Sequence, residues 1–180
     1  MVSRETPPYL HKLNEYESLV RSFASRLDLV SPGDLDTFHS RHILDSLRAL
    51  PYLPPPGEGP AIDVGSGAGL PGIPLAIAEP RRHWVLLEPR RKRAVFLEEV
   101  VRTLELSCEV VTATAADAAR IFGAQFSIAT ERALAPPGPA LALLEPLVRP
   151  GGAAILFVGA GTEVPAGSEE VERGIAIFRK

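Results

Sequence analysis

The chain has 180 residues, 46% of them hydrophobic and 23% charged, which predicts one compact domain rather than a disordered or fibrous chain. Its formal net charge of −3 excludes the strongly basic proteins that coat nucleic acid without regard to sequence. A single cysteine, Cys108, excludes an internal disulfide framework, and no apolar run has the roughly 20 residues that a membrane-spanning helix needs.

Two amphipathic helices are predicted at the start of the chain. Apolar residues recur every three or four positions over residues 9–27 and again over residues 35–50. The second helix should end before Pro51, because the residue that precedes a proline avoids helical backbone angles. Residues 51–60 contain five prolines and two glycines, which predicts a rigid surface connection rather than a flexible linker.

From residue 61 onward, short apolar runs alternate with helical patterns, which predicts βαβ units and a parallel sheet. The expected strands are residues 61–64, 84–87, 109–111, 126–129 and 153–158, with a further edge strand at 175–178. Residues 160–171 are too few for much more. The predicted fold is therefore α/β, a doubly wound and mostly parallel sheet over residues 61–180, with the helices of residues 1–50 capping one face of a single domain.

The segment from Ala61 to Pro74 reads AIDVGSGAGLPGIP and predicts a nucleotide-type loop. A buried strand delivers Asp63, and Gly65, Gly67 and Gly69 then let the backbone turn sharply and let a ligand approach closely. The glycine spacing also satisfies the dinucleotide fingerprint, so the pattern by itself leaves the choice of cofactor open.

The residues around this loop favour S-adenosylmethionine. A pyrophosphate needs free N–H groups at a helix N-terminus, and Pro71 and Pro74 remove such donors. Asp63 suits a cofactor with a positively charged amino acid portion. Glu88 ends the second strand 19 residues after Gly69, where a carboxylate can accept hydrogen bonds from both ribose hydroxyls.

Basic residues gather around the second strand. Six Arg and Lys residues between Arg81 and Arg93 face one acid, Glu88, for a local charge of +5. This cluster keeps RNA among the expected partners, although a solvated protein surface explains it equally well.

These motifs resemble the bacterial 16S rRNA guanine-N7 methyltransferases, also called the glucose-inhibited division protein B or RsmG-like family. The resemblance rests on five segments, which read RHILDS at 41–46, DVGSGAGLPGIPL at 63–75, LLEPRRKR at 86–93, RALA at 132–135 and RPGG at 149–152. It implies a Rossmann-like class I methyltransferase fold, S-adenosylmethionine as the cofactor, and 16S rRNA or the small ribosomal subunit as the partner.

The resemblance also implies roles for single residues. Gly65 and Leu70 would contact the amino acid end of the cofactor, Glu88 its ribose, and Ala115 and Ala116 its adenine. The full expected cofactor set is Asp63, Gly65, Gly67, Gly69, Leu70, Glu88, Ala115, Ala116 and Arg132. Arg132, His42 and Arg41 form the expected catalytic set; Arg90, Arg91, Lys92 and Arg93 are expected to bind RNA, and no metal is expected.

Methyl transfer to guanine N7 asks little of the protein, because N7 offers a lone pair at neutral pH and needs no general base. Catalysis then consists of aligning the reacting atoms and excluding water. Arg132 could hold guanine O6 or a phosphate. His42, one turn after Phe38, is either a core histidine or an RNA contact. Cys108 is predicted to be a small filler residue in a loop before the third strand.

Three positions depart from the pattern of the family: Val158 replaces a lysine, Asp28 an asparagine and Gly174 a histidine. They leave open a degenerate homologue that binds S-adenosylmethionine or RNA without turnover. An NAD-dependent oxidoreductase also stays open, because the glycine spacing permits it, and so does a small-molecule methyltransferase, because a fold does not determine the substrate. We expect a cytoplasmic protein, since no secretory leader follows Met1, with no membrane contact and no obligate protein partner.

Overall fold

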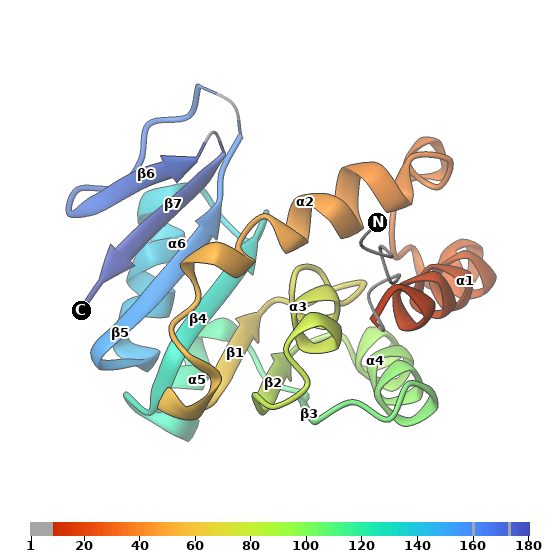
Figure 1. Ribbon diagram of the computed structural model, residues 1–180, viewed down its shortest axis with the longest axis horizontal. Helices are drawn as coiled ribbons and strands as arrows, with labels where there is room; N and C mark the ends of the chain where they lie inside the picture. Colours follow the sequence, from red (N-terminus) through yellow and green to blue (C-terminus); the bar gives the residue numbers. More distant parts are fainter. Residues whose placement is uncertain (1–8, 160, 173) are drawn as a thin grey trace, which may run out of the picture.

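A seven-stranded sheet lies at the centre of the computed structural model, which describes residues 9–159, 161–172 and 174–180 (Figure 1). The strand order is β3-β2-β1-β4-β5-β7-β6. The first five strands in chain order pair in parallel, and β7 is antiparallel to both β5 and β6. The strands are β1 (Ala61–Val64), β2 (Trp84–Leu87), β3 (Cys108–Val111), β4 (Phe126–Arg132), β5 (Val148–Phe157), β6 (Ser168–Glu172) and β7 (Ile175–Arg179).

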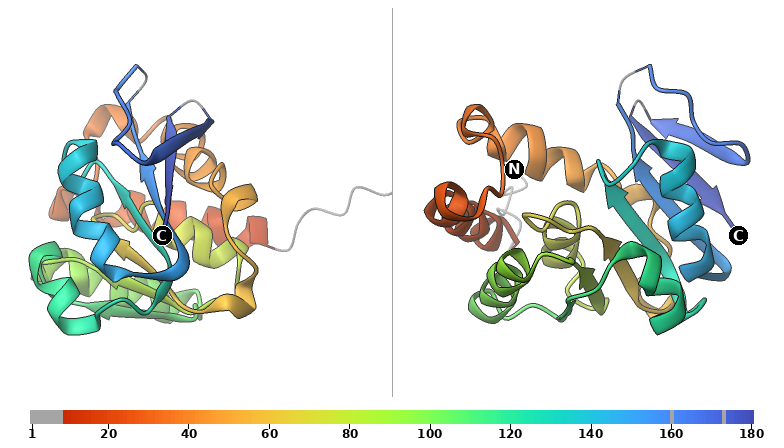
Figure 2. Two further views of the ribbon diagram at one scale, coloured as in Figure 1. Left: turned by 90° about the vertical axis from the view of Figure 1, so that its left-hand side faces the viewer. Right: turned by 180° about the vertical axis from the view of Figure 1, so that it is seen from behind.

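Helices cover both faces of this sheet. The helices are α1 (Tyr9–Leu27), α2 (Leu44–Leu47), α3 (Gly72–Ala78), α4 (Arg91–Thr103), α5 (Ala115–Phe122) and α6 (Pro137–Leu144). Seen from behind, α5 and α6 lie in front of the sheet (Figure 2). Side chains of α1, α3 and α4 pack together against its other face. The α/β fold with a mostly parallel, doubly wound sheet is therefore confirmed, as is the position of the N-terminal helices over one face.

The alternation of side chains along the strands divides the core between the two faces. Ile62 and Val64 of β1 pack with α5 and α6, whereas Leu86 of β2 packs with α1, α3 and α4. Because β1 and β2 are buried on both faces, their residues are apolar except for Asp63 of β1.

Most predicted strands are confirmed, but some of their limits are wrong. Cys108 begins β3 instead of lying in a loop before it, and β4 and β5 are longer than expected. The expectation that residues 160–171 hold little more is also wrong, because β6 begins at Ser168. Its sequence, SEEVE, has three glutamates, and it forms a strand because its exposed side chains stand at the sheet edge while its backbone pairs with β7.

The second predicted helix is not continuous but consists of short helical segments of three different types. Residues 35–50 do not form one α-helix: a five-residue π-helix over His39–Ile43 precedes the short α2, and a 3-10 turn follows at Leu50–Tyr52. The connection that follows, with a second 3-10 turn at Pro56–Glu58, packs Leu50, Tyr52 and Leu53 against the β5 and β7 side of the core.

The structure separates the six basic residues that lie between Arg81 and Arg93 in the sequence. Arg82 precedes β2, whereas Arg90 to Arg93 follow it, so the two groups lie at opposite ends of the strand. The Arg82 side chain is fully buried; its guanidinium pairs with Glu79 at 2.8 Å and donates to Ser127 Oγ at 2.9 Å. The local charge of +5 is therefore not one surface patch.

Some expectations fall outside the described residues. These are the expected lack of a secretory leader after Met1 and the first position of the segment 160–171. The division of the domain into residues 1–50 and 61–180 stays a prediction. In the part of the chain that the structure describes, no helix is long and apolar enough to cross a membrane.

Candidate active site

The glycine loop follows β1 and turns at three residues with positive φ. Gly65 and Ser66 donate their N–H groups to Leu87 O at 2.8 and 3.0 Å, which joins the loop to the end of β2. Gly69 has φ +100°, and a Cβ there would lie 2.5 Å from Ile73 Cγ1. At Gly67, by contrast, the nearest atom to such a Cβ would be 3.8 Å away. The loop is thus packed against the core at Gly69 and open at Gly67.

The N-terminus of α3 has no spare donors for a phosphate. Gly72 donates to Asp63 Oδ2 at 3.2 Å, and Ile73 donates to Gly69 O at 2.7 Å. Pro71 and Pro74 have no N–H to offer. With its amides engaged and a carboxylate beside them, this helix end does not fit a pyrophosphate.

Asp63 lies behind the loop. Its fully buried carboxylate also accepts a hydrogen bond from the Thr130 hydroxyl at 2.9 Å, and burial raises its pKa to about 6. Asp63 therefore holds β1, β4 and the start of α3 together, while its direct contact with a cofactor stays a prediction.

Glu88 lies against the open side of the loop. Its Oε2 accepts from the N–H of Gly67 at 2.8 Å, and its Oε1 accepts from the N–H of Arg90 at 2.9 Å. The predicted neighbours Glu88 and Gly67 are therefore brought together, and each carboxylate oxygen can accept a further hydrogen bond.

The remaining residues expected around the cofactor lie on neighbouring elements. Ala115 and Ala116 open α5, which follows β3, and Glu88 donates its N–H to Val111 O at the end of that strand at 3.1 Å. Leu70 is half-buried between the loop and α3. Their contact with adenine and with the amino acid end stays a prediction.

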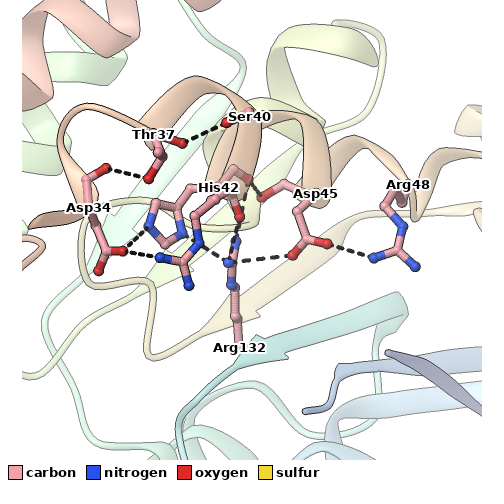
Figure 3. Close-up of polar contacts among 9 residues, drawn as sticks. Asp34, Thr37, Ser40, His42, Asp45, Arg48 and Arg132 are labelled. Carbon is pink, nitrogen blue, oxygen red and sulfur yellow. Dashed lines mark hydrogen bonds and ion pairs between the residues drawn. The ribbon is translucent and has the colours of Figure 1, made fainter. Parts of the chain in front are cut away.

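Arg132 projects from the end of β4 to the π-helix (Figure 3). Its guanidinium lies 2.9 Å from His42 Nδ1 and donates to the main-chain oxygens of His42 and Arg41 at 3.3 and 3.1 Å. The Asp45 carboxylate lies 3.4 Å away. Arg132 and His42 are thus brought together, while the Arg41 side chain points to Asp34, at 2.7 Å, and is 65% exposed.

His42 contacts both Phe38 of the hydrophobic core and Arg132 of the candidate site. Its ring lies 5.4 Å from that of Phe38, and its pKa is lowered by burial and by the Arg132 cation. Since Nδ1 faces a guanidinium donor, Nε2 carries the proton of the neutral ring. Among the described residues, Nε2 is buried without a hydrogen-bond partner, and Asp34 Oδ1 lies 3.9 Å away.

Sequence reasoning missed Tyr16, Asp45 and Glu131. The Tyr16 hydroxyl donates to Ala68 O at 2.9 Å, so α1 anchors the glycine loop. In the sequence, Tyr16 fits the apolar face of its helix and Asp45 belongs to the RHILDS segment, so each could have been singled out. Nothing in the sequence marks Glu131.

Glu131 is a buried carboxyl group at the end of β4. It is 1% exposed and accepts the N–H of Leu134 at 3.0 Å, across Ala133, whose φ is +57°. Burial raises its pKa to about 7. Leu134 in turn packs where a Cβ on Gly65 would come, within 2.8 Å. Glu131 thus secures the strained turn that touches the glycine loop.

The four residues expected to bind RNA divide into two groups. Arg90, Arg91 and Lys92 are exposed. Arg93 donates to the main-chain oxygen of Asp28 and lies 3.9 Å from where a Cβ on Gly67 would be. It therefore joins the end of α1 to the loop, and its contact with RNA stays a prediction.

Two of the positions that depart from the family pattern are neighbours. Val158 donates its N–H to Gly174 O at 2.9 Å, just beyond the end of β5. Asp28 has φ +49°, a conformation that Asn and Asp tolerate better than most residues.

No group of three His, Cys, Asp or Glu residues that could hold a metal exists within the described ranges. Burial raises the pKa of the Cys108 thiol to about 12, as suits a filler residue.

Comparison with known proteins identifies the family. Residues 9–170 match the family GidB, rRNA small subunit methyltransferase G. A relative of that name from Frankia casuarinae is 41% identical over 147 residues, which are 80% of this chain and 55% of the relative. Another, from Granulibacter bethesdensis, is 41% identical over 162 residues, 90% of this chain and 72% of the relative. The chain thus spans little more than half of the first relative.

Solved structures resemble the fold as well. A 16S rRNA methyltransferase from T. thermophilus, solved with AdoMet and guanosine, superposes with a TM-score of 0.57 at 20% identity, covering 84% of this chain and 43% of that one. At this identity the likeness concerns the fold, which is that of the Rossmann-like class I methyltransferases.

Proposed function

Because the chain belongs to the GidB family of rRNA small subunit methyltransferase G, we propose that it transfers the methyl group of S-adenosylmethionine to N7 of a guanosine in 16S rRNA. The observation that carries the proposal is the Glu88 carboxylate bonded to the open glycine Gly67. Together they offer a ribose acceptor beside a backbone that a ligand can approach.

The residues at the carboxyl ends of β1 and β2 fit S-adenosylmethionine better than a dinucleotide. The engaged amides of Gly72 and Ile73 and the buried Asp63 carboxylate oppose a pyrophosphate. Glu88 would accept the ribose hydroxyls, Gly65 and Leu70 would lie at the amino acid end, and Ala115 and Ala116 would flank the adenine. When bound, the sulfonium cofactor supplies an activated methyl group.

Arg132 and His42 would position the target base. The Arg132 guanidinium is held by the π-helix carbonyl groups and by Asp45, so its direction is set before RNA arrives. A planar guanidinium can donate to guanine O6 while N7 stays free to react. No residue is asked to move a proton, because N7 has none to lose; alignment and exclusion of water lower the barrier.

The alternative functions have less support. A binder without turnover is not favoured, because the relatives are named as methyltransferases, and Val158 and Gly174 depart from the pattern at one place outside the loop. The oxidoreductase alternative conflicts with the engaged amides of α3.

With rRNA as the proposed substrate, we expect the activity in the bacterial cytoplasm.

The test is incubation of the protein with methyl-labelled S-adenosylmethionine and small ribosomal subunits that lack guanosine N7 methylation. Mass spectrometry of the digested nucleosides should reveal labelled N7-methylguanosine. Calorimetry on the same sample should show cofactor binding. Cofactor binding without transfer to the subunits or to their naked 16S rRNA would refute the proposal.

A further inference from the structure

A groove of about 960 Å³ runs between the C-terminal half of α1 and one face of α4; apart from Arg91 and Lys92, its lining residues lie outside the candidate active site. Along α4 it extends from Arg91 to Arg102, or roughly 16 Å at the rise of an α-helix. A surface feature of this size is large enough for a nucleotide.

The wall of the groove near α1 is apolar and aromatic. Phe23 and Phe96 lie ring to ring, with centroids 5.6 Å apart. Phe96 is buried and forms the base of the groove, while Phe23 is half-buried and Val95 is 53% exposed. A flat apolar ligand could therefore pack against Phe23 and Val95 without displacing the core.

Cations gather at one end of this groove. Arg26, Arg91 and Lys92 line it, are exposed, and have no ion-pair partner among the residues that the structure describes. At the other end, Arg102 is paired with Glu99 at 2.6 Å. The groove is therefore positively charged at its Arg91 end on a chain whose net charge is −3.

The positive end adjoins the candidate active site. Arg90, next to Arg91, donates its N–H to Glu88 Oε1, and Arg93 links α4 to Asp28 at the end of α1. A chain of negative charges that enters the site at Glu88 can thus continue onto the Arg91 end of the groove, before it reaches Glu98 and Glu99 further along α4.

We propose that this groove binds an unpaired nucleotide of the RNA substrate, with its base against Phe23 and Val95 and its neighbouring phosphates on Arg26, Arg91 and Lys92. The proposal rests on the proposed function, since it assigns a second contact to the same RNA. Single-stranded nucleic acid is held in this way by proteins that combine aromatic platforms with a cationic groove.

RNA fits these observations better than a second copy of the chain. If two copies met groove to groove, the three cations would face Glu98 as the one acid left to pair among the described groove residues, because Glu99 is already engaged by Arg102. RNA provides a phosphate for each cation and a base for the apolar wall.

The first test compares Val95→Asp with Ile121→Asp. Both side chains are exposed, at 53% and 49%, and both changes add one negative charge, but Ile121 lies on α5 on the opposite face of the sheet. With undermethylated small subunits as substrate, Val95→Asp should raise KM by about 10-fold at unchanged kcat and unchanged cofactor Kd. Ile121→Asp should leave all three at the wild-type values.

The outcomes separate the two proposals. A wild-type enzyme that methylates subunits, with equal KM for both variants, would overturn the groove proposal alone. A wild-type protein without transfer would overturn the proposed function, and this inference with it. If sedimentation showed that Val95→Asp dissociates an oligomer, the groove would be an interface between copies and not an RNA site.

The second test reads the base directly. Trp84 is the single tryptophan and is fully buried, so Phe23→Trp would add a second, partly exposed fluorophore inside the groove. A single-stranded RNA oligonucleotide should quench this emission, because a base stacks on the indole, whereas polyphosphate of equal charge should not. If the oligonucleotide and polyphosphate quenched the emission equally, phosphate alone would account for binding. The proposed stacking of a base in the groove would then be wrong.

Discussion

Asp63, Glu88 and Glu131 are all buried near the carboxyl ends of β1, β2 and β4, but their hydrogen-bond partners differ. Asp63 is enclosed and bonded to Thr130 and Gly72, which suits it to hold the loop. Glu88 accepts hydrogen bonds from two main-chain N–H groups and lies at the open glycine. Glu131 is buried and accepts one N–H group, that of Leu134. Glu88 is therefore the carboxylate best placed to meet a ligand.

Replacement of Glu88 should weaken the binding of the cofactor. In Glu88→Ala the ribose loses its acceptor and the Gly67 amide loses its partner, so we expect the Kd for S-adenosylmethionine to rise by about 10- to 100-fold. Isothermal titration calorimetry measures this directly. Glu109→Ala, an exposed glutamate on β3, is the control; equal affinities in the two variants would remove Glu88 from the cofactor site.

Glu131 should make stability depend on pH. Its pKa is about 7 in the folded protein against 4.5 ordinarily, so the folded state binds the extra proton between these values and stability falls as the pH rises through this window. Urea unfolding should therefore show that the wild type loses roughly 2 kcal/mol more than Glu131→Gln between pH 4.5 and 7.5. Parallel pH profiles of the two proteins would contradict the prediction.

The glycine loop, the π-helix and β6 differ in how far the sequence predicts them. The loop and β1 and β2 follow from local chemistry, since glycine spacing and buried apolar runs mark them directly. The π-helix does not, because residues 39–43 keep the apolar spacing of an ordinary helix while Arg132, 90 residues away, bonds to its carbonyl groups. Likewise β6 depends on its pairing with β7, which the glutamates of β6 conceal.

The loop should tolerate a methyl group at one glycine and not at another. Gly69→Ala places a Cβ 2.5 Å from Ile73 and 3.2 Å from Leu97 at φ +100°, and should cost about 2 kcal/mol or more of unfolding free energy. Gly67→Ala meets no close atom and should cost about 1 kcal/mol, but should weaken cofactor binding. Urea unfolding and calorimetry on both variants check this; the reverse order of stabilities would refute it.

Across the molecule, buried polar contacts fasten segments that are far apart in the sequence. Arg82 joins the end of α3, through Glu79, to Ser127 of β4 and to the main-chain oxygen of Gly59 in the connection. The sequence could not reveal this, because Arg82 stands among other arginines and looks like a surface residue. The same limit applies to the candidate site, where Asp45 and Tyr16 gain their roles only from contacts with distant residues.

Arg82 and its neighbour Arg81 should therefore differ in their effect on stability. Arg82→Ala strips Glu79 and several buried oxygens of their donor and should cost about 3 to 5 kcal/mol. Arg81→Ala removes an exposed side chain and should change stability by less than about 0.5 kcal/mol. Thermal or urea unfolding of the pair decides; similar losses would show that the buried contacts contribute little.

The strand order also has an electrical consequence. It places the glutamates of β6, among them Glu169 and Glu170, at one edge of the sheet, roughly 29 Å from β3 at the other edge. The start of α4, with Arg91 and Lys92, follows β2 on the β3 side. With the proposed rRNA substrate, this separation of charges should turn the basic side of the sheet toward the polyanion as the two approach, so productive encounters should be more frequent than random collision allows, and added salt should abolish the advantage.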